Sequence, residues 1–125
     1  MAPPLPRPTI LVVEDEWLIA DMIDHALSQA GYRTLGPAAT VPQALALVDT
    51  EACDAALLDV NLGIEKSYAV LDRLIALGIP HLLVTGYSAS DLPDRYRHCS
   101  CLGKPLVTAT LVDALNRLLA PPPAE

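Results

Sequence analysis

Carboxylates follow two separate apolar runs in this chain of 125 residues. Glu14, Asp15 and Glu16 come directly after the first run, and Asp59 ends a later one. Burying an ionised carboxylate without a partner is costly, so Asp59 must reach solvent, a donor or a cation. Two carboxylates about 4 Å apart repel by roughly 4 kcal/mol at an effective dielectric near 20. A hard divalent cation would relieve that repulsion, and oxygen ligands suit Mg²⁺.

The candidate magnesium ligands are the side chains of Glu14, Asp15 and Asp59, with the backbone carbonyl of Asn61 as a fourth. An alternative is that the acidic residues from Glu14 onward form only the first turn of a helix, where the helix dipole favours negative charge. That alternative leaves Asp59 unexplained. A strand-end aspartate can also simply cap the loop that follows it.

Two further polar residues follow apolar runs later in the chain. Thr85 precedes Gly86, and Lys104 precedes Pro105. Taken singly, a threonine can be a strand former and a lysine can be solvated. With the carboxylates they make a complete phosphoryl-transfer site, in which a carboxylate attacks phosphorus while Thr85 and Lys104 each hold a phosphoryl oxygen. Gly86 would leave room for the group to enter.

Apolar runs alternate with helical periodicity along the chain. Strands are expected over Thr9 to Val13, Tyr32 to Leu35, Ala55 to Leu58, His81 to Val84 and Ser100 to Leu102. Gly36-Pro37 is expected to end the second strand. The segment from Asp91 to Arg97 is expected to be one or two turns of poorly anchored helix.

Four helices are expected between and after these strands. The inward face of each helix is predicted from its apolar residues, in chain order: Leu18, Ile19, Met22, Ile23, Ala26 and Leu27 on the first helix; Val41, Ala44, Leu45 and Val48 on the second; Val70, Leu71, Leu74 and Ile75 on the third; and Leu111, Val112, Leu115 and Leu118 on the last. Strands alternating with helices predict an α/β doubly wound parallel sheet with helices on both faces. In such sheets ligands bind at the carboxyl ends of the strands, which is where the polar residues lie.

Composition limits the function classes. The formal charge of -7 without any basic run argues against direct nucleic-acid binding. No segment reaches the roughly 20 apolar residues of a membrane span, and the first residues lack a signal peptide. Three cysteines do not make a disulfide framework. We therefore expect a reduced, cytoplasmic location.

The HCSC segment, with His98, Cys99 and Cys101, is a weak candidate for metal binding because zinc sites need four spaced ligands. Unmodified thiols are the alternative. Both ends of the chain are proline-rich, so residues 1–8 and 120–125 are expected to be tails on a single domain over residues 9–119.

The motifs ILVVEDE, LLDVNL, VTGY and GKP occur in the order found in response regulator receiver domains, which the chain resembles from Thr9 to Leu119. The resemblance implies a flavodoxin-like (CheY-like) sheet of strand order 2-1-3-4-5. It also implies phosphorylation of Asp59 by a histidine kinase or a phosphotransfer protein, and Mg²⁺ bound by Glu14, Asp15, Asp59 and the Asn61 carbonyl. Thr85 and Lys104 match the family's switch residues.

A narrower resemblance, to the FAT GUY subfamily of receivers, is carried by PHLLVTGYSASDLPDRYR and by DVNLGIEKSY. Leu83 and Val84 replace the first two residues of the subfamily motif, and Ile64 stands where a second glycine is common. Ordinary receivers carry an aromatic residue three positions before the lysine, but here that position is Cys101. Tyr87 is the nearest aromatic residue that could take over the role of the missing strand aromatic. The alternative is that Tyr87 is a loop tyrosine packed against the surface.

We expect a stand-alone receiver that signals to a partner protein, with the loop after the fourth strand reordering on phosphorylation. A homodimer through the last helix and the fifth strand is an open possibility. The alternatives are a small phosphatase with an aspartate nucleophile, a nucleotide or flavin module, and a docking domain that is no longer phosphorylated. His25 could be proposed as a phosphoryl carrier, although a solvated helix histidine is the simpler interpretation.

Overall fold

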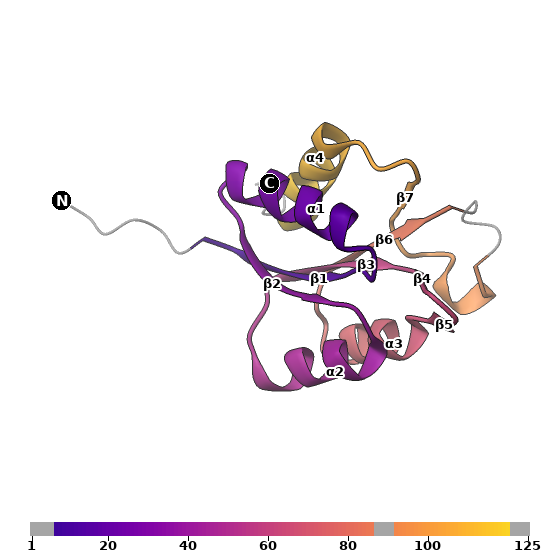
Figure 1. The fold of residues 1–125 in the computed structure, drawn as a ribbon. Helices are drawn as coiled ribbons and strands as arrows, with labels where there is room; N and C mark the ends of the chain where they lie inside the picture. The colour runs from indigo at the N-terminus through magenta and orange to yellow at the C-terminus, as the bar shows by residue number, and fades with distance from the viewer. Residues whose placement is uncertain (1–6, 87–91, 121–125) are drawn as a thin grey trace, which may run out of the picture.

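The computed structural model describes residues 7–86 and 92–120, and in them a five-stranded parallel sheet lies between two layers of helices (Figure 1). The strand order is β2-β1-β3-β6-β7. The strands are β1 (Thr9–Val13), β2 (Arg33–Ala38), β3 (Ala55–Asp59), β6 (His81–Thr85) and β7 (Cys101–Gly103). The helices are α1 (Trp17–Gln29), α2 (Val41–Thr50), α3 (Tyr68–Ala76) and α4 (Thr108–Leu119). The predicted order 2-1-3-4-5 and the doubly wound architecture are confirmed.

The two faces of the sheet carry separate apolar clusters because successive strand residues point to opposite sides. Leu11 and Leu58 pack toward α2 and α3, while Ile10 and Leu57 pack toward α1 and α4. Figure 1 shows the same division, with α1 and α4 on one face and α2 and α3 on the other. The central strands are buried on both faces, which is the usual environment of a parallel sheet.

Strand β2 is longer than predicted. It continues through Gly36 and Pro37 to Ala38, and its register against β1 shifts between Leu11 and Val13. Gly36 has a φ of +100°, which most residues with a side chain avoid, and Pro37 is tolerated because β2 is an edge strand. The expectation that Gly36-Pro37 ends the strand was therefore wrong.

A short antiparallel hairpin follows β3. It consists of β4 (Asn61–Leu62) and β5 (Glu65–Lys66), joined by Gly63 and Ile64. Gly63 has a φ of +66°, which suits a tight two-residue connection. The sequence interpretation did not include this hairpin, and it sets the path of the chain from the end of β3 to the start of α3.

Some apolar helix residues face solvent rather than the core. Leu18 and Met22 are exposed on α1, and Ile75 is exposed on α3, so these three predictions were wrong. The buried face of α1 consists of Ala20, Ile23 and Leu27. Apolar residues occupy more of the α1 surface than its contact with the sheet can cover.

The segment before β7 is anchored by one buried tyrosine. Its 3-10 helix η2 (Asp94–Tyr96) ends in Tyr96, which is only 1% exposed. The Tyr96 ring stacks on Tyr68 with centroids 5.0 Å apart, and its hydroxyl donates to Asp72 Oδ1 at 2.5 Å. Arg95 donates to the same hydroxyl at 2.6 Å. The segment from Asp91 to Arg97 was expected to be poorly anchored. For residues 92–97, which the structure describes, that expectation is wrong.

Within residues 7–86 and 92–120, every helix is too short or too polar to cross a membrane. Residues 1–6 and 121–125, which make up most of the two predicted tails, lie outside the described residues. The predicted domain limits of residues 9 and 119 fall at the start of β1 and the end of α4.

Candidate functional site

The parallel strands bring four of the predicted site residues to one edge of the sheet. Asp59 and Thr85 are the last residues of β3 and β6, while Glu14 and Lys104 come directly after β1 and β7. Three of these residues are buried: Glu14 is 4% exposed, Asp59 is 3% exposed and Thr85 is 2% exposed. Polar groups are rarely buried this deeply unless they are hydrogen-bonded or serve a function.

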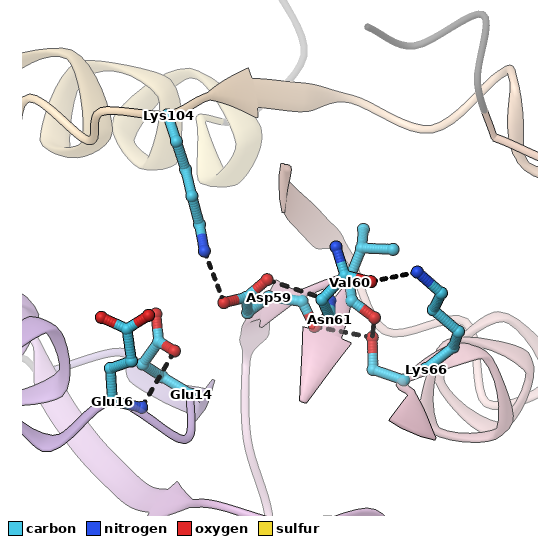
Figure 2. A network of polar contacts seen from close by, with 8 residues as sticks. Glu14, Glu16, Asp59, Val60, Asn61, Lys66 and Lys104 are labelled. Atoms are coloured by element: carbon cyan, nitrogen blue, oxygen red, sulfur yellow. Dashed lines mark hydrogen bonds and ion pairs between the residues drawn. The ribbon is translucent and has the colours of Figure 1, made fainter. Parts of the chain in front are cut away.

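Both carboxylate oxygens of Asp59 accept hydrogen bonds (Figure 2). Lys104 Nζ donates to Oδ2 at 2.8 Å, and the backbone N–H of Asn61 donates to Oδ1 at 3.0 Å. Burial alone would lower the pKa of Lys104, but its hydrogen bond to Asp59 and the charges of Asp59, Glu14 and Glu16 outweigh that effect and raise it. The ammonium group therefore stays charged beside the carboxylate.

Three carboxylates gather at this edge. Glu14, Asp15 and Asp59 each place an oxygen within 4.8 Å of the others, with Asp15 exposed to solvent. Burial, followed by the charge of Asp59, raises the pKa of Glu14 to about 7. The backbone N–H of Glu16 donates to Glu14 Oε2 at 3.2 Å and partly offsets this shift. This donor set fits a hard divalent cation such as Mg²⁺, which would relieve the repulsion among the three carboxylates.

The ends of β6 and β7 are joined beside the carboxylates. The backbone N–H of Lys104 donates to the carbonyl of Thr85 at 3.0 Å. Pro105 follows Lys104 through a cis peptide bond. A Cβ built on Gly86 would meet no described atom within 4 Å, so the residues that the structure describes do not themselves require a glycine there. Tyr87 lies outside the described residues.

Cys101 lies half-buried on β7, where it pairs with Leu83 of β6. Burial raises the pKa of the Cys101 thiol and of the Cys99 thiol. Among the described residues, the carboxylate cluster is the one group of three or more potential ligands close enough to share an ion. His98, Cys99 and Cys101 form no such group in that part of the chain.

Two residues near Asp59 were not predicted to take part. Ser67 Oγ donates to the backbone carbonyl of Asp59 at 2.7 Å. Lys66 Nζ donates to Asn61 Oδ1 (Figure 2). A serine before a helix predicts a cap, and a lysine in a polar stretch predicts a solvated side chain. The hairpin brings both residues back to the site, and its Gly63-Ile64 turn was the sequence signal that could have indicated them.

The sequence family of the response regulator receiver domain matches residues 10–116. The chain belongs to this family. Receiver domains are signalling domains rather than ordinary enzymes. The predicted family membership is therefore confirmed, together with the fold that it implied.

Solved structures and a curated relative agree with this assignment. The receiver is 41% identical to SdrG from Sphingomonas melonis Fr1, covering 91% of this chain and 98% of that one, with a TM-score of 0.78. A CheY-like receiver domain from Methanospirillum hungatei JF-1 is 25% identical with a TM-score of 0.81, over 91% and 94% of the two chains. The transcriptional regulatory protein PdtaR of Mycobacterium tuberculosis is 27% identical over 114 residues.

The receiver covers only part of the curated relative. The match takes in 86% of this chain but 54% of PdtaR, so the chain spans about half the length of that protein. The likeness to PdtaR therefore concerns the receiver domain.

Proposed function

We propose that this receiver accepts a phosphoryl group on Asp59 from a histidine kinase or a histidine phosphotransfer protein and signals to a partner protein. The observation that carries the proposal is the buried Asp59 carboxylate, which is held between Lys104 Nζ and the Asn61 amide and lies beside Glu14 and Asp15. A carboxylate fixed at both oxygens is oriented before it reacts, and orientation supplies much of the rate of such a transfer.

In the transfer, a carboxylate oxygen of Asp59 forms the new bond to phosphorus while the bond from phosphorus to the histidine nitrogen breaks. The electron pair of the broken bond stays on the imidazole. Lys104 keeps its positive charge because its pKa is raised, so it can stabilise the negative phosphoryl oxygens. Thr85 ends the neighbouring strand, from which its hydroxyl can hold another of these oxygens.

Glu14, Asp15, Asp59 and the backbone carbonyl of Asn61 would hold Mg²⁺. When bound, Mg²⁺ supplies positive charge that neutralises the transferring phosphoryl group. The observation in its favour is electrostatic: two buried carboxylates, one with its pKa raised to about 7, lie within 4.8 Å of a third.

Phosphorylation would signal through Thr85 and Lys104. These residues end neighbouring strands whose backbones are hydrogen-bonded at 3.0 Å, so contacts of both side chains with a phosphoryl group would bias the segment between β6 and β7. Cys101 cannot supply the ring rotation of the usual strand aromatic, and Tyr87 remains the predicted substitute. The FAT GUY assignment stays a prediction that rests on the VTGY segment.

The proposal is tested by incubating the protein with acetyl phosphate and Mg²⁺ and measuring the intact mass. We expect one added phosphoryl group, which is lost in the Asp59→Asn variant and strongly reduced when EDTA replaces Mg²⁺. Asp49→Asn is the matched control, because Asp49 is an exposed aspartate on α2 and its replacement should leave the mass gain unchanged. An Asp59→Asn protein that still gains the group would refute the site, and a folded wild type that gains none would support a docking role instead.

A further inference from the structure

We infer that Ser67 is a positioning residue for phosphoryl transfer, which holds the turn that aims the Asp59 carboxylate. This inference rests on the proposed function of Asp59. Ser67 is 1% exposed, and its hydroxyl donates to the backbone carbonyl of Asp59 at 2.7 Å, with a longer contact of 3.4 Å to the carbonyl of Val60.

Ser67 does not do what a serine at its position ordinarily does. It is the N-cap residue of α3, and an N-cap serine usually accepts a hydrogen bond from a backbone N–H of the first helical turn. Here the side chain makes no capping bond. At the start of α2, by contrast, the Thr40 hydroxyl accepts from the Gln43 N–H at 3.2 Å. The Ser67 hydroxyl therefore serves the end of β3 rather than its own helix.

The backbone of Ser67 joins the same turn to α3. Its N–H donates to the carbonyl of Val60 at 3.0 Å, and its carbonyl accepts from the amides of Val70 and Leu71. Ser67 thus closes the hairpin and links residues 59 and 60 to the first turn of the helix. The next residue, Tyr68, stacks on the buried Tyr96 ring, which gives the start of α3 a second anchor.

This turn decides where the Asp59 carboxylate points. The N–H of Asn61 donates to Asp59 Oδ1, and its direction depends on the backbone at residues 59 and 60, which Ser67 holds by their carbonyls. Without the hydroxyl, the buried Asp59 carbonyl loses this partner and the turn gains freedom. A carboxylate misaligned by as little as about 1 Å can lose up to roughly a hundredfold in rate.

The decisive experiment compares wild type with Ser67→Ala, Ser67→Cys and Ser67→Thr in phosphorylation by acetyl phosphate at saturating Mg²⁺. We expect Ser67→Ala to lower the maximal rate by about tenfold with little change in the half-saturating acetyl phosphate concentration. Ser67→Thr keeps the hydroxyl and should restore most of the rate. Ser67→Cys keeps the size but donates weakly, so it should stay slow, and it serves in place of the alanine variant if that protein does not fold.

Thr40→Ala is the matched control, since it removes a hydroxyl that does cap its own helix, α2, and that makes no hydrogen bond to Asp59, Asn61 or Lys104. It should lose thermal stability while phosphorylating at the wild-type rate. A Ser67→Ala or Ser67→Cys protein whose maximal rate lies within about twofold of wild type would overturn the inference, as would a Ser67→Thr protein as slow as Ser67→Ala.

A second measurement does not depend on phosphorylation. In the metal-free protein, hydrogen exchange of the Asn61 amide should be about tenfold faster in Ser67→Ala than in wild type and unchanged in Thr40→Ala. If wild type gains no phosphoryl group, the proposed function of Asp59 fails, and this exchange rate still shows whether Ser67 holds the turn. Equal Asn61 exchange in wild type and Ser67→Ala would contradict the positioning role.

Discussion

Lys104 Nζ donates a 2.8 Å hydrogen bond to Asp59 Oδ2, although the two residues are 45 positions apart in the chain. The Asp59 side chain is 3% exposed and that of Lys104 is 30% exposed, so the pair is partly shielded from solvent. A shielded pair is more sensitive to loss of one partner than a surface pair, because the remaining charge stays buried.

Replacing this lysine should therefore destabilise the metal-free protein. We expect Lys104→Met to lower the free energy of unfolding by about 1–3 kcal/mol, because the buried Asp59 carboxylate loses its ammonium partner. Lys66→Met is the control, since Lys66 and its hydrogen bond to Asn61 are exposed to solvent and its loss should change stability by less than about 0.5 kcal/mol. Urea unfolding in EDTA measures both, and equal stabilities of the two variants would contradict the expectation.

The raised pKa of Glu14 predicts a pH dependence of stability. Burial, and then the Asp59 charge, raises it from 4.5 to about 7, so the folded metal-free protein binds this proton more tightly than the unfolded chain. The resulting stabilisation is complete below the unfolded pKa and is lost as the pH rises through the folded pKa.

Glu14→Gln removes this titration. Relative to wild type, the variant should gain about 1–3 kcal/mol of stability between roughly pH 5 and pH 8, because only wild type then carries the buried charge. Urea unfolding in EDTA at several pH values gives the difference, in which the other titrating groups largely cancel. A difference that stays flat over this range would contradict the raised pKa of Glu14 in the folded protein.

The Tyr96 anchor should contribute strongly to stability. We expect Tyr96→Phe to cost about 1 kcal/mol through loss of the hydrogen bond to Asp72, and Tyr96→Ala about 3–5 kcal/mol because a buried ring is removed. Asp94→Ala, in the same 3-10 helix but exposed, should stay within about 0.5 kcal/mol of wild type. Thermal unfolding would distinguish the three, and a Tyr96→Ala protein as stable as Asp94→Ala would mean that η2 is not held by its tyrosine.

Gly36 should tolerate no side chain. Its φ is +100°, and a Cβ there would lie 2.8 Å from the Ala38 nitrogen and 2.9 Å from the Val12 oxygen, both backbone atoms. We expect Gly36→Ala to destabilise by about 3 kcal/mol or more, since β2 must move away from β1. Gly31 also has a positive φ, but its Cβ would meet no described atom within 4 Å, so Gly31→Ala should cost only about 1 kcal/mol. Equal losses would indicate that the close approach at Gly36 is relieved by a small shift.

The alternation of strands and helices and the meeting of the strand ends at one edge could be predicted, because both depend on where apolar runs and helical periodicity occur along the chain. The apolar runs that end in Asp59 and Thr85 are buried strands, and parallel strands necessarily bring their carboxyl ends to one edge. Asp59 and Lys104 were therefore expected at one site, although the sequence does not indicate the hydrogen bond between them. The position of each charge at the end of a strand was enough to predict that the two would lie near each other.

Local features that depend on side-chain packing could not be predicted in this way. Tyr96 is a single aromatic in a polar segment, so no periodicity indicates that it is buried. Leu18 and Met22 fit an inward helix face by spacing, but the area of contact with the sheet decides which residues are covered. Ser67 has the residue type and position of an N-cap, and only the structure shows that its hydroxyl donates to Asp59 instead.

The site of phosphoryl attachment tests the account most directly. After reaction with acetyl phosphate and Mg²⁺, borohydride reduces an aspartyl phosphate to homoserine, and peptide mass spectrometry then locates the reduced residue. We predict homoserine at position 59 and at no other carboxylate, with none formed in unphosphorylated protein. Homoserine at position 15 or 54, or a phosphoryl group found on His25, would contradict the assignment of Asp59 as the acceptor.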